Sequence, residues 1–368
     1  MLKPSLSVVL LLAAFATLSF AEGSKVHQPK LIPQNSGTTQ GLIAVSPVNS
    51  RVVWASGRGG TFVLTTNGGK TWTAGVVPGA EALQFRDVQG VSDKVAYLQS
   101  IGINPTDFRI YKTIDGGATW TMEFQNQLVG AFYDCFAFWT PRRGISHSDS
   151  VNGVFPDLRT RNGQTWQDIS ANMPPALPGE ASFAASGTCV ATQGERNAWI
   201  ATGGATSARI LATRDGGNTW NAYDTPLVSS PSAGAFTVAF RDQRHGIVGG
   251  GDLDPLDPNN ARTATSNDGG RNWTLTNAPP VTGAIFGLSY AYRIGNDERS
   301  NDERDEERDN FARTVVITAN DGGAAWTPDE GKNWFLLNGV VGYWAVGFAT
   351  PKAGWLVGVN GTILKIRF

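Results

Sequence analysis

The sequence is poor in the residues on which many catalytic and metal sites depend. Among 368 residues there are only 3 His, 2 Cys and 3 Met. The three histidines, His27, His147 and His245, stand in unrelated sequence contexts. A histidine-based metal site or a Ser-His-Asp triad therefore lacks its parts.

Charge is also scarce, and neither sign dominates. Charged residues make up 17% of the chain, and the formal net charge is −1. Nucleic-acid and membrane-surface proteins usually carry a basic excess. The glycine-rich stretches, such as "GGGD" at 249–252, lead into loops and not into a phosphate-binding turn followed by a helix. We therefore expect no nucleic acid, no nucleotide and no cofactor.

Long apolar runs are absent outside the N-terminus. There, Lys3 precedes an apolar stretch from Val8 to Phe20, which ends in a small-x-small site at Ser19-Phe20-Ala21. The run is too short to span a bilayer and has the parts of a secretory signal peptide. We predict that residues 1–21 are removed and that residues 22–368 act in the periplasm or outside the cell. An uncleaved anchor is the alternative.

Glycine and tryptophan, by contrast, are abundant, with 44 and 12 copies. They recur in one motif: "TTNGGKTW" at 65–72, "TIDGGATW" at 113–120, "TRNGQTW" at 160–166, "TRDGGNTW" at 213–220, "SNDGGRNW" at 266–273 and "TPDEGKNW" at 327–334. Successive closing tryptophans are 46 to 61 residues apart. Propeller blades of four strands repeat with a similar period.

Each repeat has the same internal order of short β-branched and aromatic runs separated by turn residues. An apolar strand, a turn, a second strand and a third strand lead into the motif, and the tryptophan opens the fourth strand. A last repeat begins at Tyr343 and ends after its third strand. We expect the segment 25–34, "KVHQPKLIPQ", to supply its missing outer strand. The prediction is an all-β, seven-bladed β-propeller with four-stranded antiparallel blades, forming a single domain.

The motif itself is expected to staple a turn. Its Asp or Asn can accept hydrogen bonds from turn amides, its glycines supply positive φ, and its tryptophan buries a ring between sheets. A row of catalytic aspartates is the alternative, but a catalytic site needs different residues that converge on one point.

These copies resemble the BNR or Asp-box repeat, whose proteins include sialidases, some endoglucanases, sorting receptors and the photosystem II assembly and stability-factor propellers. The repeat spacing and the ending "GWLVGVNGTILKI" at 354–366 are most similar to the last group. Sialidases require an Arg-Ile-Pro near the first strand. Here "KLIP" at 30–33 has Leu31 in the arginine's place, so the substrate clamp of a sialidase is missing.

One first strand departs from its sister repeats. Aligning first strands by the residue before the Gly turn puts Arg86 level with apolar residues, namely Phe136, Val238, Leu288 and Val346. A buried arginine there needs a partner, and Asp87 and Asp134 are the candidates. Either a strand shift turns Arg86 outward, or a charged cluster stands at the mouth of the central channel. The family resemblance implies that ligands meet this mouth, opposite the Asp-box turns.

The same alignment places the two cysteines at equivalent positions, level with Ala345. A bridge between Cys135 and Cys189 would join the third and fourth blades, and export permits one disulfide. Two free buried thiols are the alternative.

Loops on the mouth side carry further polar residues: Arg58, Asp149, Glu180 and Asp252. The loop from Asp252 to Asp257 has the oxygen density of a calcium loop without an EF-hand spacing, and ordinary Asp-Pro turn chemistry is the alternative. The segment 295–310 is predicted to be a disordered insertion, because residues 297–309 hold eight acidic and three basic side chains.

The function we predict is an exported, non-catalytic binding propeller. It would act as a monomeric assembly or stability factor, or a scaffold, for an envelope protein or membrane complex. The expected binding residues lie at the mouth: Arg58, Arg86, Asp87, Asp134, Asp149, Glu180 and Asp252. The rival is a glycoside hydrolase that uses two of these carboxylates. Two of them about 5–10 Å apart across an open cleft would favour hydrolysis, whereas carboxylates bound to Arg86 would favour structure or partner binding.

Overall fold

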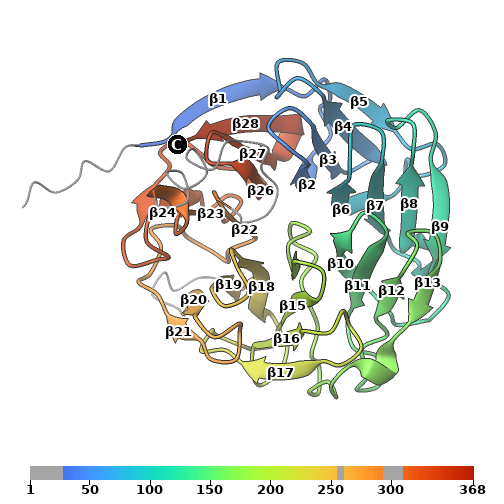
Figure 1. Ribbon diagram of the computed structural model, residues 1–368, viewed down its shortest axis with the longest axis vertical. Coiled ribbons are helices and arrows are strands. Elements are labelled where there is room, and N and C mark those ends of the chain that lie inside the picture. The colour runs from blue at the N-terminus through green and yellow to red at the C-terminus, as the bar shows by residue number, and fades with distance from the viewer. Residues whose placement is uncertain (1–27, 255–260, 293–309) are drawn as a thin grey trace, which may run out of the picture.

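The computed structural model describes residues 28–254, 261–292 and 310–368. Seven four-stranded antiparallel sheets stand around a central axis (Figure 1), so the predicted seven-bladed propeller is confirmed. No helix in the described residues has the length and apolar character needed to cross a bilayer. The predicted signal peptide, Asp257 and almost all of the charged insertion lie outside these residues.

The first three blades run in chain order from the inner strand to the outer strand. Blade 1 contains β2 (Leu42–Pro47), β3 (Val53–Gly57), β4 (Thr61–Thr65) and β5 (Thr73–Val76). Blade 2 contains β6 (Gln84–Gly90), β7 (Ala96–Ile101), β8 (Arg109–Thr113) and β9 (Thr121–Gln125). Blade 3 contains β10 (Tyr133–Thr140), β11 (Arg143–Ser148), β12 (Leu158–Thr160) and β13 (Trp166–Asp168).

The next three blades repeat this order. Blade 4 contains β14 (Val190–Gln193), β15 (Asn197–Thr202), β16 (Arg209–Thr213) and β17 (Asn221–Asp224). Blade 5 contains β18 (Ala233–Phe240), β19 (Gly246–Asp252), β20 (Thr263–Ser266) and β21 (Thr274–Leu275). Blade 6 contains β22 (Gly287–Tyr290), β23 (Val315–Thr318), β24 (Ala324–Thr327) and β25 (Phe335–Leu336).

Blade 7 closes the ring with strands from both ends of the chain. Its inner strands are β26 (Tyr343–Thr350), β27 (Ala353–Gly358) and β28 (Thr362–Arg367), and its outer strand is β1 (Lys30–Asn35). β1 pairs antiparallel with β28 from Lys30↔Arg367 to Asn35↔Thr362. Figure 1 shows the two strands side by side at the seam. The predicted closing strand is therefore confirmed, with its start at Lys30.

The core lies between neighbouring blades. At the junction of blades 4 and 5, Trp199 and Phe240 stack with ring centroids 3.6 Å apart. Trp199 is 1% exposed, and its Nε1 donates to the carbonyl oxygen of Gly269 at 2.8 Å. Large aromatic side chains therefore fill the wedge between sheets while their polar atoms find backbone partners.

The repeated motif forms the predicted stapled turn. In the copy at 213–220, Thr213 Oγ1 donates to Asp215 Oδ1 at 2.8 Å and accepts from the amide of Gly217 at 3.1 Å. The amide of Thr219 donates to Asp215 Oδ1 at 3.0 Å. Gly217 has φ +81°, a conformation that glycine adopts without strain. These carboxylates are thus occupied in holding turns.

Candidate functional site

The two faces of the ring differ in their connections. Turns between strands 1 and 2 and between strands 3 and 4 of each blade lie on what we call the motif face. Loops between strands 2 and 3, and the connections from one blade to the next, lie on the opposite side, the mouth face. Inner strands therefore begin at the mouth face, and the residues at their starts surround the end of the central channel.

Inner strands carry a bulge close to that start. Register shifts in five blades leave one residue without a direct partner on the second strand. These residues are Ile43, Arg86, Asp134, Phe236 and Trp344. A bulge locally bends a strand and redirects a side chain. Each of these five strands therefore places one side chain outside the regular ladder near the mouth.

The predicted alignment of Arg86 with Phe136, Val238, Leu288 and Val346 is wrong. Val88, which pairs with Leu98, is the residue level with Phe136, which pairs with Ser146. The turn glycine used as the anchor is missing from blade 2, where Ala96 starts the second strand. In blades 3, 5 and 7 the residue level with Ala96 is a glycine. Each of these glycines pairs with a phenylalanine of the inner strand: Phe138↔Gly144, Phe240↔Gly246 and Phe348↔Gly354. Arg86 lies two residues closer to the mouth.

Arg86 reaches across the mouth instead of pairing with a carboxylate. Its Nη1 donates to the carbonyl oxygen of Ala184 at 2.9 Å, and its Nη2 donates to Gln84 Oε1 at 3.2 Å. Its Cζ lies 5.6 Å from the ring centroid of Trp344. Within the described residues, no carboxylate approaches Arg86 within ion-pair distance, and its Nε has no hydrogen-bond partner. The expected pairing with Asp87 or Asp134 is absent.

Aromatic rings form a row beside Arg86. Phe183 stacks on Phe236 with centroids 3.9 Å apart, and Phe236 lies 6.2 Å from Phe286. Phe286 in turn stacks on Trp344 at 5.1 Å. Phe236 is buried, whereas the other three rings are only partly buried. The mouth thus has an apolar half next to a cationic guanidinium.

Residues 181–188, which we call the mouth segment, cross the mouth before β14. The amide of Ser182 donates to Asp149 Oδ1 at 2.8 Å, and Ser186 Oγ donates to the carbonyl oxygen of Phe286 at 2.6 Å. The hydroxyls of Thr188 and Thr237 are 2.7 Å apart. Together with the Arg86 bond, these contacts tie the segment to blades 2, 3, 5 and 6. The mouth segment has no counterpart in the other repeats, so the repeat pattern does not predict its course.

Asp87 faces inward below this segment. Its Oδ1 accepts from the amide of Val88 at 2.7 Å, and its Oδ2 accepts from the amide of Phe136 at 2.8 Å. A Cβ on Gly187 would come 2.5 Å from Oδ1, so only glycine fits there. Burial raises the pKa of Asp87 well above its usual range, although the two backbone hydrogen bonds lower it. Asp87 therefore links two blades structurally.

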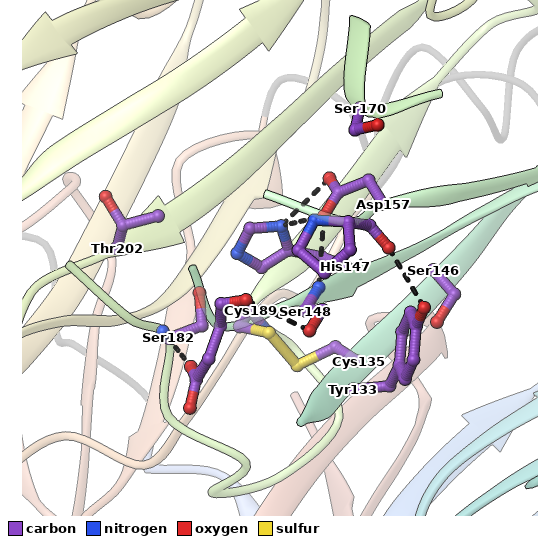
Figure 2. A network of polar contacts seen from close by, with 12 residues as sticks. Tyr133, Cys135, Ser146, His147, Ser148, Asp157, Ser170, Ser182, Cys189 and Thr202 are labelled. Carbon is purple, nitrogen blue, oxygen red and sulfur yellow. Dashed lines mark hydrogen bonds and ion pairs between the residues drawn. A yellow bond between two sulfur atoms is a disulfide. The ribbon is translucent and has the colours of Figure 1, made fainter. Parts of the chain in front are cut away.

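A second buried polar group lies in blade 3. His147 Nδ1 is 2.9 Å from both carboxylate oxygens of Asp157, and neither side chain is exposed. Figure 2 shows this pair beside the disulfide. The amide of Ser148 donates to Asp157 at 3.1 Å, whereas His147 Nε2 has no partner in the described residues. No sequence pattern predicts this pair, because a single histidine without a second ligand at a regular spacing carries no signal.

Asp134 and Asp149 lie close enough for each to change the pKa of the other. Burial, followed by the charge of Asp149, raises the pKa of Asp134 well above its usual range. Burial also raises the pKa of Asp149, against the hydrogen bond from the Ser182 amide. Asp134 is 1% exposed and shares a hydrogen bond with Asp149, which requires a proton on one of the two carboxyl groups. Both carboxyl groups therefore have a raised pKa, and the shift is larger at Asp134.

The remaining predicted residues are dispersed. Glu180 is buried and accepts from Thr202 Oγ1 at 2.6 Å and from Arg209 Nε at 2.9 Å, so it is held in an ion pair. Asp252 accepts from Ser232 Oγ at 2.7 Å and from the Asp254 amide at 3.0 Å, as in an ordinary turn. No cluster of three potential metal ligands occurs in the described part of the chain. Arg58 is exposed on the loop between β3 and β4.

The two cysteines form a disulfide, whereas the sequence allowed either a disulfide or two free buried thiols. Cys135 and Cys189 are fully buried on neighbouring inner strands with Cα atoms 5.9 Å apart. Figure 2 places the bond under the polar group of blade 3. The bridge joins blades 3 and 4 next to the anchors of the mouth segment.

The channel itself holds a cavity of about 900 Å³. Its lining includes the exposed turn residues Pro141 and Glu195 at the motif face, and the buried Asp87 and Ser186 at the other end. The cavity is thus open toward the motif face and ends at the mouth segment.

Exposed apolar side chains gather on the mouth face. Of the twelve large apolar residues that are exposed in the described part of the chain, seven belong to loops of this face. They are Ile103, Leu128, Val129, Val154, Leu253, Val341 and Val359. Only Ile114 stands in a turn of the motif face, and the other four lie on outermost strands. Sequence reasoning missed this set, because the residues are single and have no periodic pattern.

Comparisons with known proteins reach the chain only through its structure. No family model and no curated protein matches it. A solved structure of YCF48 bound to a D1 peptide is similar with a TM-score of 0.61 at 14% identity, covering 94% of this chain and 98% of that one.

Two further structures have the same architecture. YCF48 from Cyanidioschyzon merolae gives a TM-score of 0.61 at 15% identity, over 92% of this chain and 98% of that one. The WD40 propeller domain of Doa1 gives 0.55 at 12% identity, over 92% and 96%. At these identities the likeness shows the fold: this chain is a seven-bladed propeller of the kind that YCF48 also adopts.

Proposed function

We propose that this protein is an exported, non-catalytic binding propeller. It serves as an assembly or stability factor, or a scaffold, for an envelope protein or membrane complex. It works as a monomer without a cofactor, in the periplasm or outside the cell, and docks through its mouth face. Export is inferred from the signal-peptide features of residues 1–21.

The observation that carries the proposal is the gathering of exposed apolar side chains on one face. Val129 is 77% exposed, Ile103 98% and Val341 61%, all on mouth-face loops. Exposed apolar side chains on one face can contribute to a protein interaction site. Loops held by a rigid scaffold are also the usual place for binding residues.

The carboxylates support binding more than hydrolysis. A glycoside hydrolase needs two accessible carboxyl groups that flank a substrate about 5–10 Å apart. Asp87 and Asp134 are buried at the mouth, and Glu180 is held by Arg209. They serve the packing of the blades and of the mouth segment, which leaves the hydrolase alternative without a supporting observation.

The structural neighbours support the same reading by analogy. One of them is YCF48 in complex with a D1 peptide. The repeats of this chain also resemble those of assembly-factor propellers. A peptide segment of a membrane protein is therefore the kind of partner that we propose here.

A site-specific photo-crosslinker tests the docking face. The photoreactive residue replaces Val129 or Val341 on the mouth face, or Ile114, which is 69% exposed on the motif face, as the matched control. The tagged protein is irradiated in its own cells, and adducts are identified by mass spectrometry. We expect one discrete envelope or membrane protein joined at Val129 and Val341 but not at Ile114. Adducts only from Ile114, or none from any position, would overturn the proposal.

A further inference from the structure

The centre of the mouth face holds a positive charge that the protein itself leaves without a counter-ion. Two other partly buried arginines are held by carboxylates: Arg209 binds Glu180, and Arg241 binds Glu330 and Asp242. Arg86 has only a carbonyl, an amide oxygen and the face of Trp344. Burial of a cation without a paired anion is costly.

A second arginine adds to this charge. Burial, together with the charge of Arg58 nearby, lowers the pKa of Arg86 to about 10, so Arg86 remains a cation at neutral pH. Arg58 is exposed, and no ion pair forms on it within the described residues. Its Nε lies 3.8 Å from the position that a Cβ on Gly41 would take, beside the inner strand of blade 1.

The nearest acid does not cancel the charge. Asp134 acts on Arg86 through space, but its burial next to Asp149 favours its neutral form. The carboxylates of Asp87 and Asp149 are engaged by backbone amides. The charges of Arg58 and Arg86 at the mouth are therefore not neutralised by the nearby aspartates.

We propose that Arg58 and Arg86 form a subsite for a carboxylate that is attached to an apolar or aromatic group. The guanidinium of Arg86 is suited to paired hydrogen bonds with a carboxylate. The partly exposed rings of Phe183, Phe286 and Trp344 lie next to it and would receive the apolar group. The rings favour an organic carboxylate over inorganic phosphate, because phosphate has no apolar group to place against them. This subsite deepens the proposed function and rests on it for the choice of face.

Two sources can supply this chemistry, a free organic acid or the C-terminus of a protein chain. The probes are 3-phenylpropionate and a hexapeptide that ends in phenylalanine with a free carboxylate. Each has a neutral twin, 3-phenylpropanamide and the same peptide amidated. Binding is measured by isothermal titration calorimetry on the mature protein. We expect both acids to bind and both amides to fail.

Arg58→Gln is the test variant, because Arg58 is exposed and its loss leaves the fold intact. Arg142→Gln, an exposed arginine on the motif face, is the matched control. Loss of one charge-assisted contact should lower the affinity for both acids by about tenfold, and the control variant should bind them as the wild type does. Arg86→Lys, checked for folding by circular dichroism, should abolish binding. A peptide that binds at least about tenfold more tightly than 3-phenylpropionate identifies a chain terminus as the source, and equal affinities identify a free acid.

The subsite is refuted if the amides bind as well as the acids, or if Arg58→Gln and Arg142→Gln have equal effects. It is equally refuted if no acid binds. In each of these cases the photo-crosslink at Val129 decides separately on the proposed function. An adduct that persists there means that the docking face is right and the carboxylate subsite is wrong.

Discussion

The side-chain oxygen of Gln34 accepts a hydrogen bond from the indole Nε1 of Trp355 at 3.2 Å, although the two residues come from opposite ends of the chain. The same oxygen accepts from Nε1 of Trp72 at 3.1 Å. Gln34 therefore joins the outer strand of blade 7, the second strand of blade 7 and the first motif of blade 1. The ring closes through this side chain as well as through the β1–β28 ladder.

Gln34→Ala should destabilise the protein by about 1–3 kcal/mol, because two indole N–H groups lose their acceptor in a largely buried place. Urea unfolding followed by tryptophan fluorescence measures the loss. Gln127→Ala, at an exposed position, is the control and should change little. Equal stability of the two variants would show that the β1–β28 ladder alone closes the ring.

Asp134→Asn should stabilise the protein at neutral pH, because asparagine is neutral without taking up a proton and its amide can still donate to Asp149. Burial raises the pKa of Asp134 above its ordinary value of 3.8, so the folded state holds the proton more tightly than the unfolded state. The resulting destabilisation is present at neutral pH and disappears below about pH 3.8. The gain from Asn should therefore shrink between pH 7 and pH 3 in urea unfolding. A gain that does not depend on pH would contradict this account.

Asp157→Asn is the contrasting variant for that experiment. Asp157 accepts from His147 and from the amide of Ser148, so its replacement should destabilise the fold. If both variants shifted stability in the same direction, buried charge would not be the cause.

Removal of the disulfide by the double change Cys135→Ala and Cys189→Ala should cost about 4 kcal/mol, because the bond closes a loop with a sequence separation of 54 residues. Both side chains are fully buried, so the removal of two sulfur atoms also costs some packing and adds to this loss. Thiol titration of the denatured wild type should find no free thiol. Free thiols there, or unchanged unfolding of the variant, would show that the bond does not form in the native protein.

The motif turns should contribute less to stability in acid. The hydroxyl of Thr119 and other turn donors lower the pKa of Asp115 to about 2, against an ordinary value of 3.8. A depressed pKa contributes stability above pH 3.8 that is lost as the pH falls toward 2.

Asp115→Asn should therefore lower the Tm at pH 7, and the difference from wild type should close between pH 4 and pH 2. Thermal unfolding followed by circular dichroism measures both. Asp93→Asn, at an exposed turn carboxylate without a partner in the described residues, is the control. If the difference in Tm between the variant and the wild type stayed constant across this pH range, the hydrogen bonds of ionised Asp115 would not be its cause.

The fold was largely readable from the sequence, because turn chemistry and strand patterning repeat in every blade. Even the closing strand could be deduced, since the last repeat lacked its fourth strand and the segment before the first repeat lacked a partner. The alignment failed in blade 2 for a local reason. Ala96 stands where blades 3, 5 and 7 have the turn glycine, so the register of Arg86 was displaced by two residues.

The site was less predictable, because its parts do not repeat. The mouth segment crosses several blades through backbone and hydroxyl contacts that leave no periodic signal. His147 and Asp157 meet only because β11 pairs with the strand that follows Asp157. The apolar loop residues are scattered along the chain and come together only on the folded ring.

The bulge near the start of the inner strands separates recognition from architecture. Equivalent places carry an aliphatic, a cationic, an acidic and two aromatic side chains: Ile43, Arg86, Asp134, Phe236 and Trp344. The strand pairs below each bulge keep one register whichever residue stands there. Single substitutions at these places would therefore change the side chains near the mouth without changing the register of the strand pairs below them.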